Sequence, residues 1–282
     1  MLQRSEGFFQ SLKPGRLFFQ NWKVQNPVGT VIITHGHGEH SECYHRLVDF
    51  FKNDSWNFIA WDIRGHGKSE GPRGYAEHFQ DYLDDFKTFI NNCLQLEDVK
   101  NKPVILLSHS MGGMIQLRAL AEDLDLQKKI TAQVCSAPFL EVAMPVPEWK
   151  KFLAKKVSNF LPHLTMDSGM KNEYLTHDPE VIRECEQDPL RHQKVSPRVY
   201  LGFLECFEKI PGLAVNITLP TLFQLPEKDP VVSTPRGREV FKKLGSSNKE
   251  IYIYADACHE IYNDTLRKNA YADLKKFLDQ WK

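Results

Sequence analysis

The sequence lacks the long apolar runs that are typical of secreted and membrane-spanning chains. Its first ten residues, MLQRSEGFFQ, are interrupted by Arg4, Glu6 and Gln10, and no later run approaches the length of a membrane span. It also lacks an excess of charge, because 36 Lys and Arg balance 36 Asp and Glu. Such a balance gives no reason to expect a nucleic-acid partner. We therefore expect a cytoplasmic protein that acts on small or neutral molecules.

Cysteine pairs with metal-binding or redox spacing are also absent. The six cysteines are widely scattered and include no C-x-x-C pair, so neither a zinc ribbon nor a redox motif is indicated. An even number would permit disulfides, but free thiols are the better expectation for a large cytosolic enzyme. The six are Cys43, Cys93, Cys135, Cys185, Cys206 and Cys258.

Short β-rich runs alternate with longer helical patterns along much of the chain. The helical patterns cover residues 79–96 and 270–281, and strands interleaved with such helices predict βαβ units. We expect an α/β fold with a mostly parallel, doubly wound sheet. The predicted strands are Thr30–Thr34, Asn57–Trp61, Val104–Ser108, Ala132–Ser136, Thr221–Leu225 and Glu250–Tyr254.

The alternation stops between about Phe139 and Gly212. No β-rich run appears there, and the segment opens with prolines at 138, 145 and 147. A structureless loop of this length is implausible in a compact domain, so the segment predicts a helical cap inserted late in the sheet. Residues 1–138 and 213–282 would form the core, and residues 139–212 the cap.

The stretch THGHGEH at residues 34–40 places three histidines and a glutamate close together. Clustered imidazoles and a carboxylate can hold zinc and generate a metal-bound hydroxide. A metal-dependent hydrolase is therefore one interpretation of this stretch. The alternative is that it forms a sharp turn beside an active site of another kind.

A second motif, SHSMGG at residues 108–113, follows the predicted strand VILLS and precedes a helical pattern. In a nucleophile elbow, a serine occupies a strained strand-to-helix turn with small residues two positions before and after it. Ser110 fits the serine, and Ser108 and Gly112 fit the small positions. The usual first residue is glycine, so Ser108 is a small departure.

A serine nucleophile needs a base, and the base needs an acid that fixes its tautomer. In this fold the chain order is Ser, then Asp or Glu, then His. Asp229 follows the strand TLFQL, and His259 follows the strand EIYIY, so both order and placement fit. We predict a triad of Ser110, Asp229 and His259.

Together the motifs resemble α/β-hydrolases of the monoacylglycerol lipase and lysophospholipase group, which is related to serine-aminopeptidase-like hydrolases. They are HGHGEH at 35–40, DIRGHGKSEG at 62–71, SHSMGG at 108–113, QDPL at 187–190, then Asp229 and His259. The resemblance implies a serine hydrolase that cleaves carboxylic esters of single-chain lipids without cofactor or metal. It also implies an oxyanion hole built from the backbone N–H groups of His37 and Met111.

The predicted cap contains a basic amphipathic helical pattern with apolar residues on one side and lysines on the other. This apolar side could cover the core, rest on a membrane surface or line an acyl-binding tunnel above Ser110. We take it as the candidate acyl-binding surface, with peripheral membrane contact as a further possibility. Its apolar residues include Trp149, Phe152, Leu153, Val157 and Phe160.

Recognition of the substrate's polar end is less well defined. The resemblance suggests Glu39, but Cys43 and Cys185 stand where monoacylglycerol lipases tend to carry an arginine and a tyrosine. An aminopeptidase-like enzyme, with Glu173, Glu184 or Glu186 binding a substrate amine, is one alternative, and a general carboxylesterase is another. A non-catalytic binding module is disfavoured because all three triad positions are filled, and the oligomeric state is left open.

Overall fold

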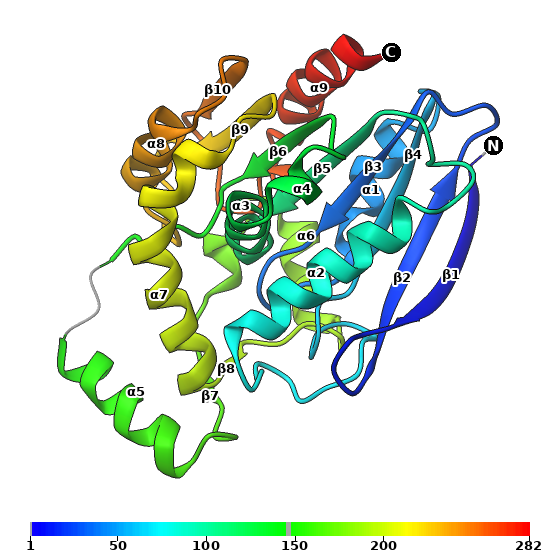
Figure 1. The fold of residues 1–282 in the computed structure, drawn as a ribbon. Coiled ribbons are helices and arrows are strands. Elements are labelled where there is room, and N and C mark those ends of the chain that lie inside the picture. The colour runs from blue at the N-terminus through cyan, green and yellow to red at the C-terminus, as the bar shows by residue number, and fades with distance from the viewer. Residues whose placement is uncertain (1, 145–147) are drawn as a thin grey trace.

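The computed structural model describes residues 2–144 and 148–282, apart from the side chains of residues 148 and 150–153. Its centre is an eight-stranded sheet in the order β1-β2-β4-β3-β5-β6-β9-β10 (Figure 1). The strands from β4 to β10 run parallel to their neighbours, and β2 runs antiparallel to both β1 and β4. The mostly parallel sheet confirms the predicted fold class.

The six predicted strands are all present, with bounds that differ from the prediction by at most one residue at either end. Their apolar character follows from burial on both faces, because helices cover a parallel sheet from both sides. They are β3 (Gly29–Thr34), β4 (Trp56–Trp61), β5 (Val104–His109), β6 (Ala132–Ser136), β9 (Thr221–Pro226) and β10 (Lys249–Tyr254).

Two strands were missed by the sequence analysis. These are β1 (Gln3–Gln10) and β2 (Arg16–Lys23), which form an antiparallel hairpin at one edge of the sheet. Polar residues interrupt both, and β1 is largely exposed, so neither has the apolar run of a central strand. Strand β1 lacks this signal because it is the exposed edge strand, and β2, which is largely buried, carries Gln20 and Asn21 within its run.

Side chains from the two faces of the sheet form separate apolar cores. Along β3, Ile32 points into one core, while Val31 and Ile33 point into the other. This alternation is the two-residue period of a β-strand. The helices that cover the first face are α2 (Phe79–Cys93), α3 (Met111–Glu122), α7 (Pro197–Leu213) and α8 (Thr234–Lys243). The helices on the other face are α1 (His45–Phe50) and α9 (Arg267–Leu278).

The segment between β6 and β9 is largely helical, as the cap prediction requires. Helix α7 packs against α2 and α3 of the core, whereas α5 packs mainly against α7 and projects from the molecule (Figure 1). The division of the chain into core and cap at residues 139 and 212 remains a prediction. The elements of this segment are α5 (Glu148–Phe160), β7 (Met166–Asp167), α6 (Pro179–Gln187), β8 (Lys194–Val195) and α7.

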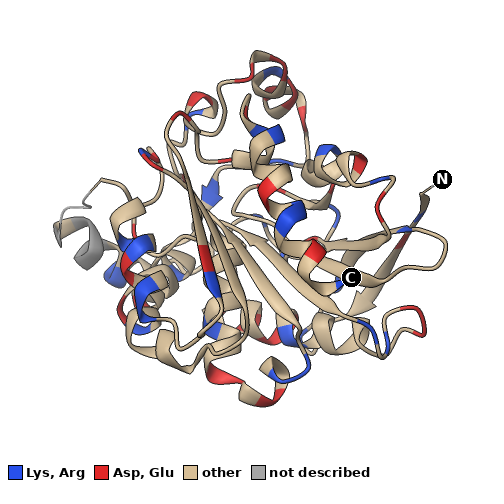
Figure 2. Ribbon diagram, turned by 90° about the horizontal axis from the view of Figure 1, so that it is seen from above, with Lys and Arg blue, Asp and Glu red and all other residues tan. Residues whose placement is uncertain are grey.

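Charged residues lie mainly on the outer helices and loops. Figure 2 shows blue and red segments of both signs around the molecule, while the central strands are almost entirely tan. Among the described helices, none combines the length and apolar character needed to span a bilayer.

Candidate active site

Ser110 lies in the sharp turn between β5 and α3. Its backbone has φ 49° and ψ −118°, a strained conformation for a residue with a side chain. The turn requires small neighbours, because a Cβ on Gly112 would come within 2.4 Å of the carbonyl oxygens of Thr34 and His35. Strand β5 and helix α3 therefore hold Ser110 at the carboxyl end of the sheet, as in a nucleophile elbow.

The structure brings the three predicted triad residues together from distant parts of the chain. His259 Nε2 lies 2.9 Å from Ser110 Oγ, and His259 Nδ1 lies 2.8 Å from Asp229 Oδ2. All three side chains are buried. The other carboxylate oxygen of Asp229 accepts hydrogen bonds from the N–H groups of Val231 and Val232, at 2.8 and 3.0 Å. This arrangement can pass the serine proton to an imidazole that a fixed carboxylate orients.

The electrostatic environment favours a charged His259–Asp229 pair. Burial alone would lower the pKa of His259, but attraction and hydrogen bonding to Asp229 outweigh it and raise this pKa. Burial would raise the pKa of Asp229, but His259 and the two backbone donors lower it. The imidazolium that would form during proton transfer is therefore stabilised where it is needed.

The predicted oxyanion loop lies against the nucleophile. A Cβ on Gly36 would come within 3.0 Å of the Ser110 Cβ, so the turn after β3 touches Ser110. Met111 is the first residue of α3, where backbone N–H groups have no partner within the helix. His37 follows Gly36, and its ring packs against His66, His192 and Phe203. This placement leaves its backbone amide as the group that would serve the site.

Glu39 is buried at the edge of the site. Its carboxylate accepts a hydrogen bond of 3.0 Å from the Tyr44 hydroxyl, and its other oxygen lies 3.3 Å from His109 Nε2. The ring of His109 packs against that of His259, with 4.7 Å between centroids. Burial and the nearby Glu260 raise the pKa of Glu39. Glu39 thus adjoins the catalytic machinery, and contact with a substrate's polar end remains a prediction.

Comparison with known proteins shows which family the chain belongs to. The family model described as "Serine aminopeptidase, S33" matches residues 25–266. The chain belongs to this family of hydrolases. This membership confirms the resemblance noted in the sequence, since the matched region contains the elbow, Asp229, His259 and the whole predicted cap.

Two relatives and one solved structure illustrate the likeness. The chain is 27% identical over 262 residues to a protein named phospholipase YtpA from Bacillus subtilis, covering 92% of this chain and 98% of that one. It is 25% identical over 277 residues to a monoacylglycerol lipase from Mycolicibacterium smegmatis, covering 98% and 97%. A soluble variant of monoglyceride lipase from Saccharomyces cerevisiae, solved with a substrate analog, aligns with a TM-score of 0.86 at 21% identity. That alignment covers 98% of this chain and 95% of the other, and it shows the shared fold.

An ion pair that the sequence analysis missed links the predicted cap segment to the loop that contains His259. Arg191 donates two hydrogen bonds, of 2.8 and 3.0 Å, to the carboxylate of Glu260, which directly follows His259. Burial would raise the pKa of Glu260, but Arg191 lowers it. Arg191 follows the DPL stretch by one position, so an arginine beside that motif was the available signal. Cys43 and Cys185 line a pocket that also contains Arg46 of α1 and Arg191, so guanidinium groups do reach this corner.

The predicted acyl-binding residues of α5 differ in their positions. Trp149 and Phe160 are 63% and 81% exposed, and Val157 is partly buried. The predictions for Phe152 and Leu153 concern side chains outside the described part of the chain. Trp149 and Phe160 therefore lie on the surface of the protein and not in its interior.

Apolar side chains that the sequence analysis did not select lie closer to the nucleophile. The N–H of Phe139 donates a 2.9 Å hydrogen bond to the carbonyl oxygen of Ser110. The Phe139 ring packs edge-on against Phe203 and Phe207 of α7, with centroids 5.2 and 5.0 Å apart. Phe203 also contacts the ring of His37 in the oxyanion loop. We call these three phenylalanines the apolar wall; Phe139 joins it to Ser110 through the backbone, and Phe203 joins it to the oxyanion loop.

The histidines of THGHGEH are not arranged as a metal site. Among the described residues, the one group of His, Cys, Asp and Glu with ligand atoms close enough for one ion is His177, Cys258 and Asp264. His35 instead accepts a 2.9 Å hydrogen bond from the N–H of Ile63, which fixes the turn after β3. Burial lowers the pKa of His35 to about 3 and that of His37 to about 4, so both rings are neutral.

Proposed function

We propose that this protein is a serine hydrolase that cleaves carboxylic esters of single-chain lipids, of the lysophospholipase or monoacylglycerol lipase type. The observation that carries the proposal is the hydrogen-bonded chain from Ser110 through His259 to Asp229. The relatives named phospholipase and monoacylglycerol lipase, each aligned over more than nine-tenths of both chains, support the substrate class.

In the proposed reaction, Ser110 Oγ attacks the ester carbonyl while His259 Nε2 takes its proton. The N–H groups of His37 and Met111 stabilise the resulting oxyanion, and Asp229 stabilises the imidazolium. His259 then protonates the departing alcohol, which leaves an acyl-enzyme on Ser110. Water, deprotonated by the same imidazole, releases the fatty acid and restores Ser110. No step requires a metal or an organic cofactor.

A lipid acyl chain suits the apolar wall beside the nucleophile. We infer that the acyl group of an ester extends along Phe139, Phe203 and Phe207, whose rings pack together and whose first member is hydrogen-bonded to the Ser110 backbone. Val157 on α5 is partly buried, and we keep it as a proposed acyl-binding residue. The wall therefore gives the acyl chain an apolar environment from its first carbons onward.

The peptidase alternative requires a carboxylate that binds the substrate's amine near the nucleophile. Glu173, Glu184 and Glu186 are all exposed, and Glu184 forms a 2.5 Å ion pair with Arg46. These positions favour the ester substrate over the aminoacyl substrate. A panel of lipid esters and aminoacyl amides tests the choice, and faster cleavage of the amides would contradict the proposal.

The acyl wall predicts a steep dependence on chain length. Each methylene buried against the phenylalanines contributes up to ~0.8 kcal/mol, so kcat/KM should rise about threefold to fourfold per carbon until the site is full. The measurement is hydrolysis of p-nitrophenyl esters from acetyl to palmitoyl. Phe207→Ala should flatten the dependence, whereas Phe241→Ala, on α8 away from Ser110, serves as a control. A preference for acetyl esters would contradict the proposed acyl site.

Headgroup selectivity is expected to be weak. Arg191 is bound by Glu260, and cysteines occupy positions 43 and 185. The site therefore offers few fixed hydrogen-bond donors that would lose their partner when the headgroup changes. Monoacylglycerols and lysophospholipids of one acyl length should then differ in kcat/KM by no more than about tenfold, or ~1.4 kcal/mol. Strict selectivity for monoacylglycerol would contradict this prediction.

We further infer that the protein is cytoplasmic and touches membranes through α5 and the residues that follow it. Trp149, Phe160 and Leu161 are more than half exposed, and Lys155 and Lys156 lie on the same helix. Exposed aromatic and aliphatic side chains beside lysines are typical of helices that rest on anionic membranes.

This inference predicts that the Phe160→Ser/Leu161→Ser double variant binds anionic phospholipid vesicles more weakly, by at least tenfold in a sedimentation assay. Hydrolysis of a soluble short-chain ester should stay near the wild-type rate, because neither side chain lies beside Ser110. The matched control is Leu12→Ser, which removes an exposed leucine from the β1–β2 turn. Equal loss of vesicle binding in that control would contradict a specific membrane surface.

A further inference from the structure

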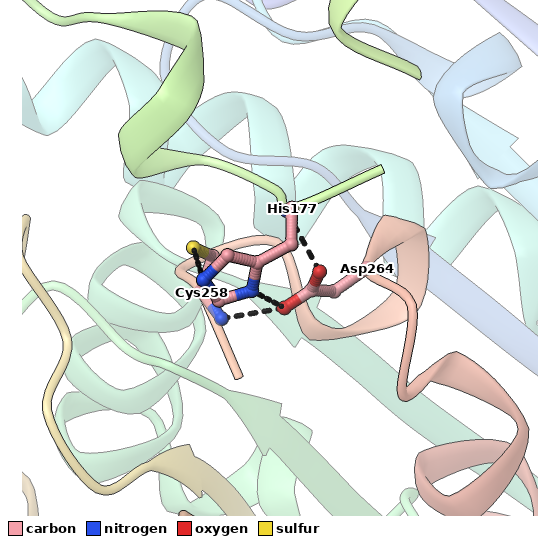
Figure 3. Close-up of side chains that lie close together, drawn as sticks. All are labelled: His177, Cys258 and Asp264. Carbon is pink, nitrogen blue, oxygen red and sulfur yellow. Dashed lines mark hydrogen bonds and ion pairs between the residues drawn. The ribbon is translucent and has the colours of Figure 1, made fainter. Parts of the chain in front are cut away.

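A cysteine, a histidine and an aspartate meet beside the catalytic loop, outside the proposed catalytic residues. Cys258 directly precedes His259, Asp264 lies six positions after Cys258, and His177 comes from the segment before α6. Figure 3 shows the Cys258 sulfur facing one ring nitrogen of His177 and the Asp264 carboxylate facing the other. The three ligand atoms lie within 4.8 Å of one another.

Asp264 orients the histidine ring. Its buried carboxylate accepts hydrogen bonds from the N–H groups of His177 and Cys258, at 2.8 and 2.6 Å, and lies 3.2 Å from His177 Nδ1. When Nδ1–H donates a hydrogen bond to this carboxylate, Nε2 carries the lone pair, which faces Cys258. An aspartate that fixes a histidine in this way is a common outer partner of metal-binding imidazoles.

The distance between the two remaining donors fits one small ion. Cys258 Sγ lies 3.4 Å from His177 Nε2. A tetrahedral zinc with Zn–S of about 2.3 Å and Zn–N of about 2.0 Å separates its ligands by ~3.5 Å. The His177 side chain is 55% exposed, so an ion could enter with the waters that complete its coordination.

The surrounding charge suits a cation. The carboxylates of Asp264 and Asp229 lie near the Cys258 thiol, and both are buried. Such surroundings disfavour a free thiolate that reacts with electrophiles, because reactive cysteines need electropositive neighbours. A bound cation supplies the positive charge itself and displaces the thiol proton.

We propose that Cys258 Sγ and His177 Nε2 bind a borderline-soft divalent cation of the zinc class, with Asp264 holding the imidazole in place. The ion fastens the cap segment to the loop of the catalytic histidine. These two segments already touch through backbone hydrogen bonds from His259 N–H to the Tyr174 carbonyl, at 3.2 Å, and from Glu260 N–H to the Leu175 carbonyl, at 2.8 Å. This site is separate from the catalytic chemistry, which uses no metal in the proposed mechanism.

The test is titration of the purified, EDTA-treated protein with Co²⁺, which reports thiolate coordination through a charge-transfer absorption band. We expect one equivalent to produce the band, and one equivalent of Zn²⁺ to displace it. Zn²⁺ should also slow backbone hydrogen exchange in residues 173–178 and 257–264, because it links the two segments. The absence of a band, or unchanged exchange in both segments, would overturn the proposal.

Three variants locate the site. Cys258→Ser should abolish the band, and His177→Gln should weaken Co²⁺ binding at least tenfold. His177→Gln replaces an exposed side chain, so it keeps the test valid even where Cys258→Ser fails to fold. Cys43→Ser is the matched control and should retain the band, since Cys43 lies in the pocket with Arg191. Loss of the band in Cys43→Ser, or its retention in Cys258→Ser, would place the ion elsewhere. Because these readouts do not use hydrolysis, their failure would leave the proposed esterase activity untouched.

Discussion

Replacing Ser110 with alanine is expected to reduce ester hydrolysis by on the order of 10⁴-fold to 10⁶-fold, as removal of a serine nucleophile does in other hydrolases. The residual rate would come from the oxyanion hole and substrate binding, which the substitution leaves in place. The variant should also lose covalent labelling by a fluorophosphonate, with the wild-type label mapped to Ser110 by mass spectrometry. Its circular dichroism spectrum should match that of the wild type, because the substitution removes a hydroxyl that contacts His259 and leaves the backbone of the elbow unchanged.

Ser108→Ala is the matched control for this experiment. Ser108 belongs to the same motif, but its hydroxyl donates a 3.3 Å hydrogen bond to the Val134 carbonyl and does not take part in the triad. Hydrolysis and labelling should therefore persist. An active Ser110→Ala variant would show that the chemistry lies elsewhere, and labelling at a different residue would identify where.

The second large effect is acid destabilisation. Burial lowers the pKa of five histidines, to about 4 for His37, to about 3 for three others, and well below the usual value for His66. Above pH ~6.5 these rings are neutral in both folded and unfolded chains. As the pH falls below that value, the unfolded chain binds protons that the folded protein cannot, so stability decreases by about 1.4 kcal/mol per pH unit for each group. The three others are His35, His109 and His192.

Two groups oppose this trend over the same range. The pKa values of Glu39 and His259 are raised, so both bind protons more readily in the folded protein. The five histidines outweigh these two groups, so the free energy of unfolding should fall by several kcal/mol between about pH 7 and pH 5. A loss of this size is comparable with the whole stability of a typical domain. Urea unfolding across this range should show the midpoint falling steeply as the pH decreases.

His192→Gln tests the origin of the acid effect. His192 lies in the cap segment, and its ring packs 4.6 Å from His66 and 5.4 Å from His37, between centroids. Removing one titrating group should reduce the loss of stability on acidification, whatever it does to stability at neutral pH. His45→Gln, at an exposed histidine, is the matched control. A urea midpoint that does not change with pH in the wild type would contradict the assignment of the acid effect to the buried histidines.

Local sequence patterns were sufficient for the six parallel strands and for the sharp turn that contains Ser110. The strands around Ile32 and Leu106 are continuous apolar runs because both faces of a parallel strand are buried, and the elbow requires small residues at fixed offsets from Ser110. Such requirements act within a few residues, so they are visible in the sequence. Strands β1 and β2 are interrupted by polar residues and have no such continuous apolar run, and they were missed.

The sequence by itself therefore determined the α/β class, the turn that contains Ser110 and the chain order of the three residues predicted as a triad. Only the tertiary structure decided which side chains surround that turn. Arg191 meets Glu260 across 69 positions, and Cys258 faces His177 across 81, so neither contact has a local pattern. The exposure of Trp149 and Phe160 also depends on tertiary packing. An amphipathic helix has one apolar side in its sequence whether or not another element covers that side. Contacts of this kind depend on how distant segments pack, and packing is specified by the whole chain.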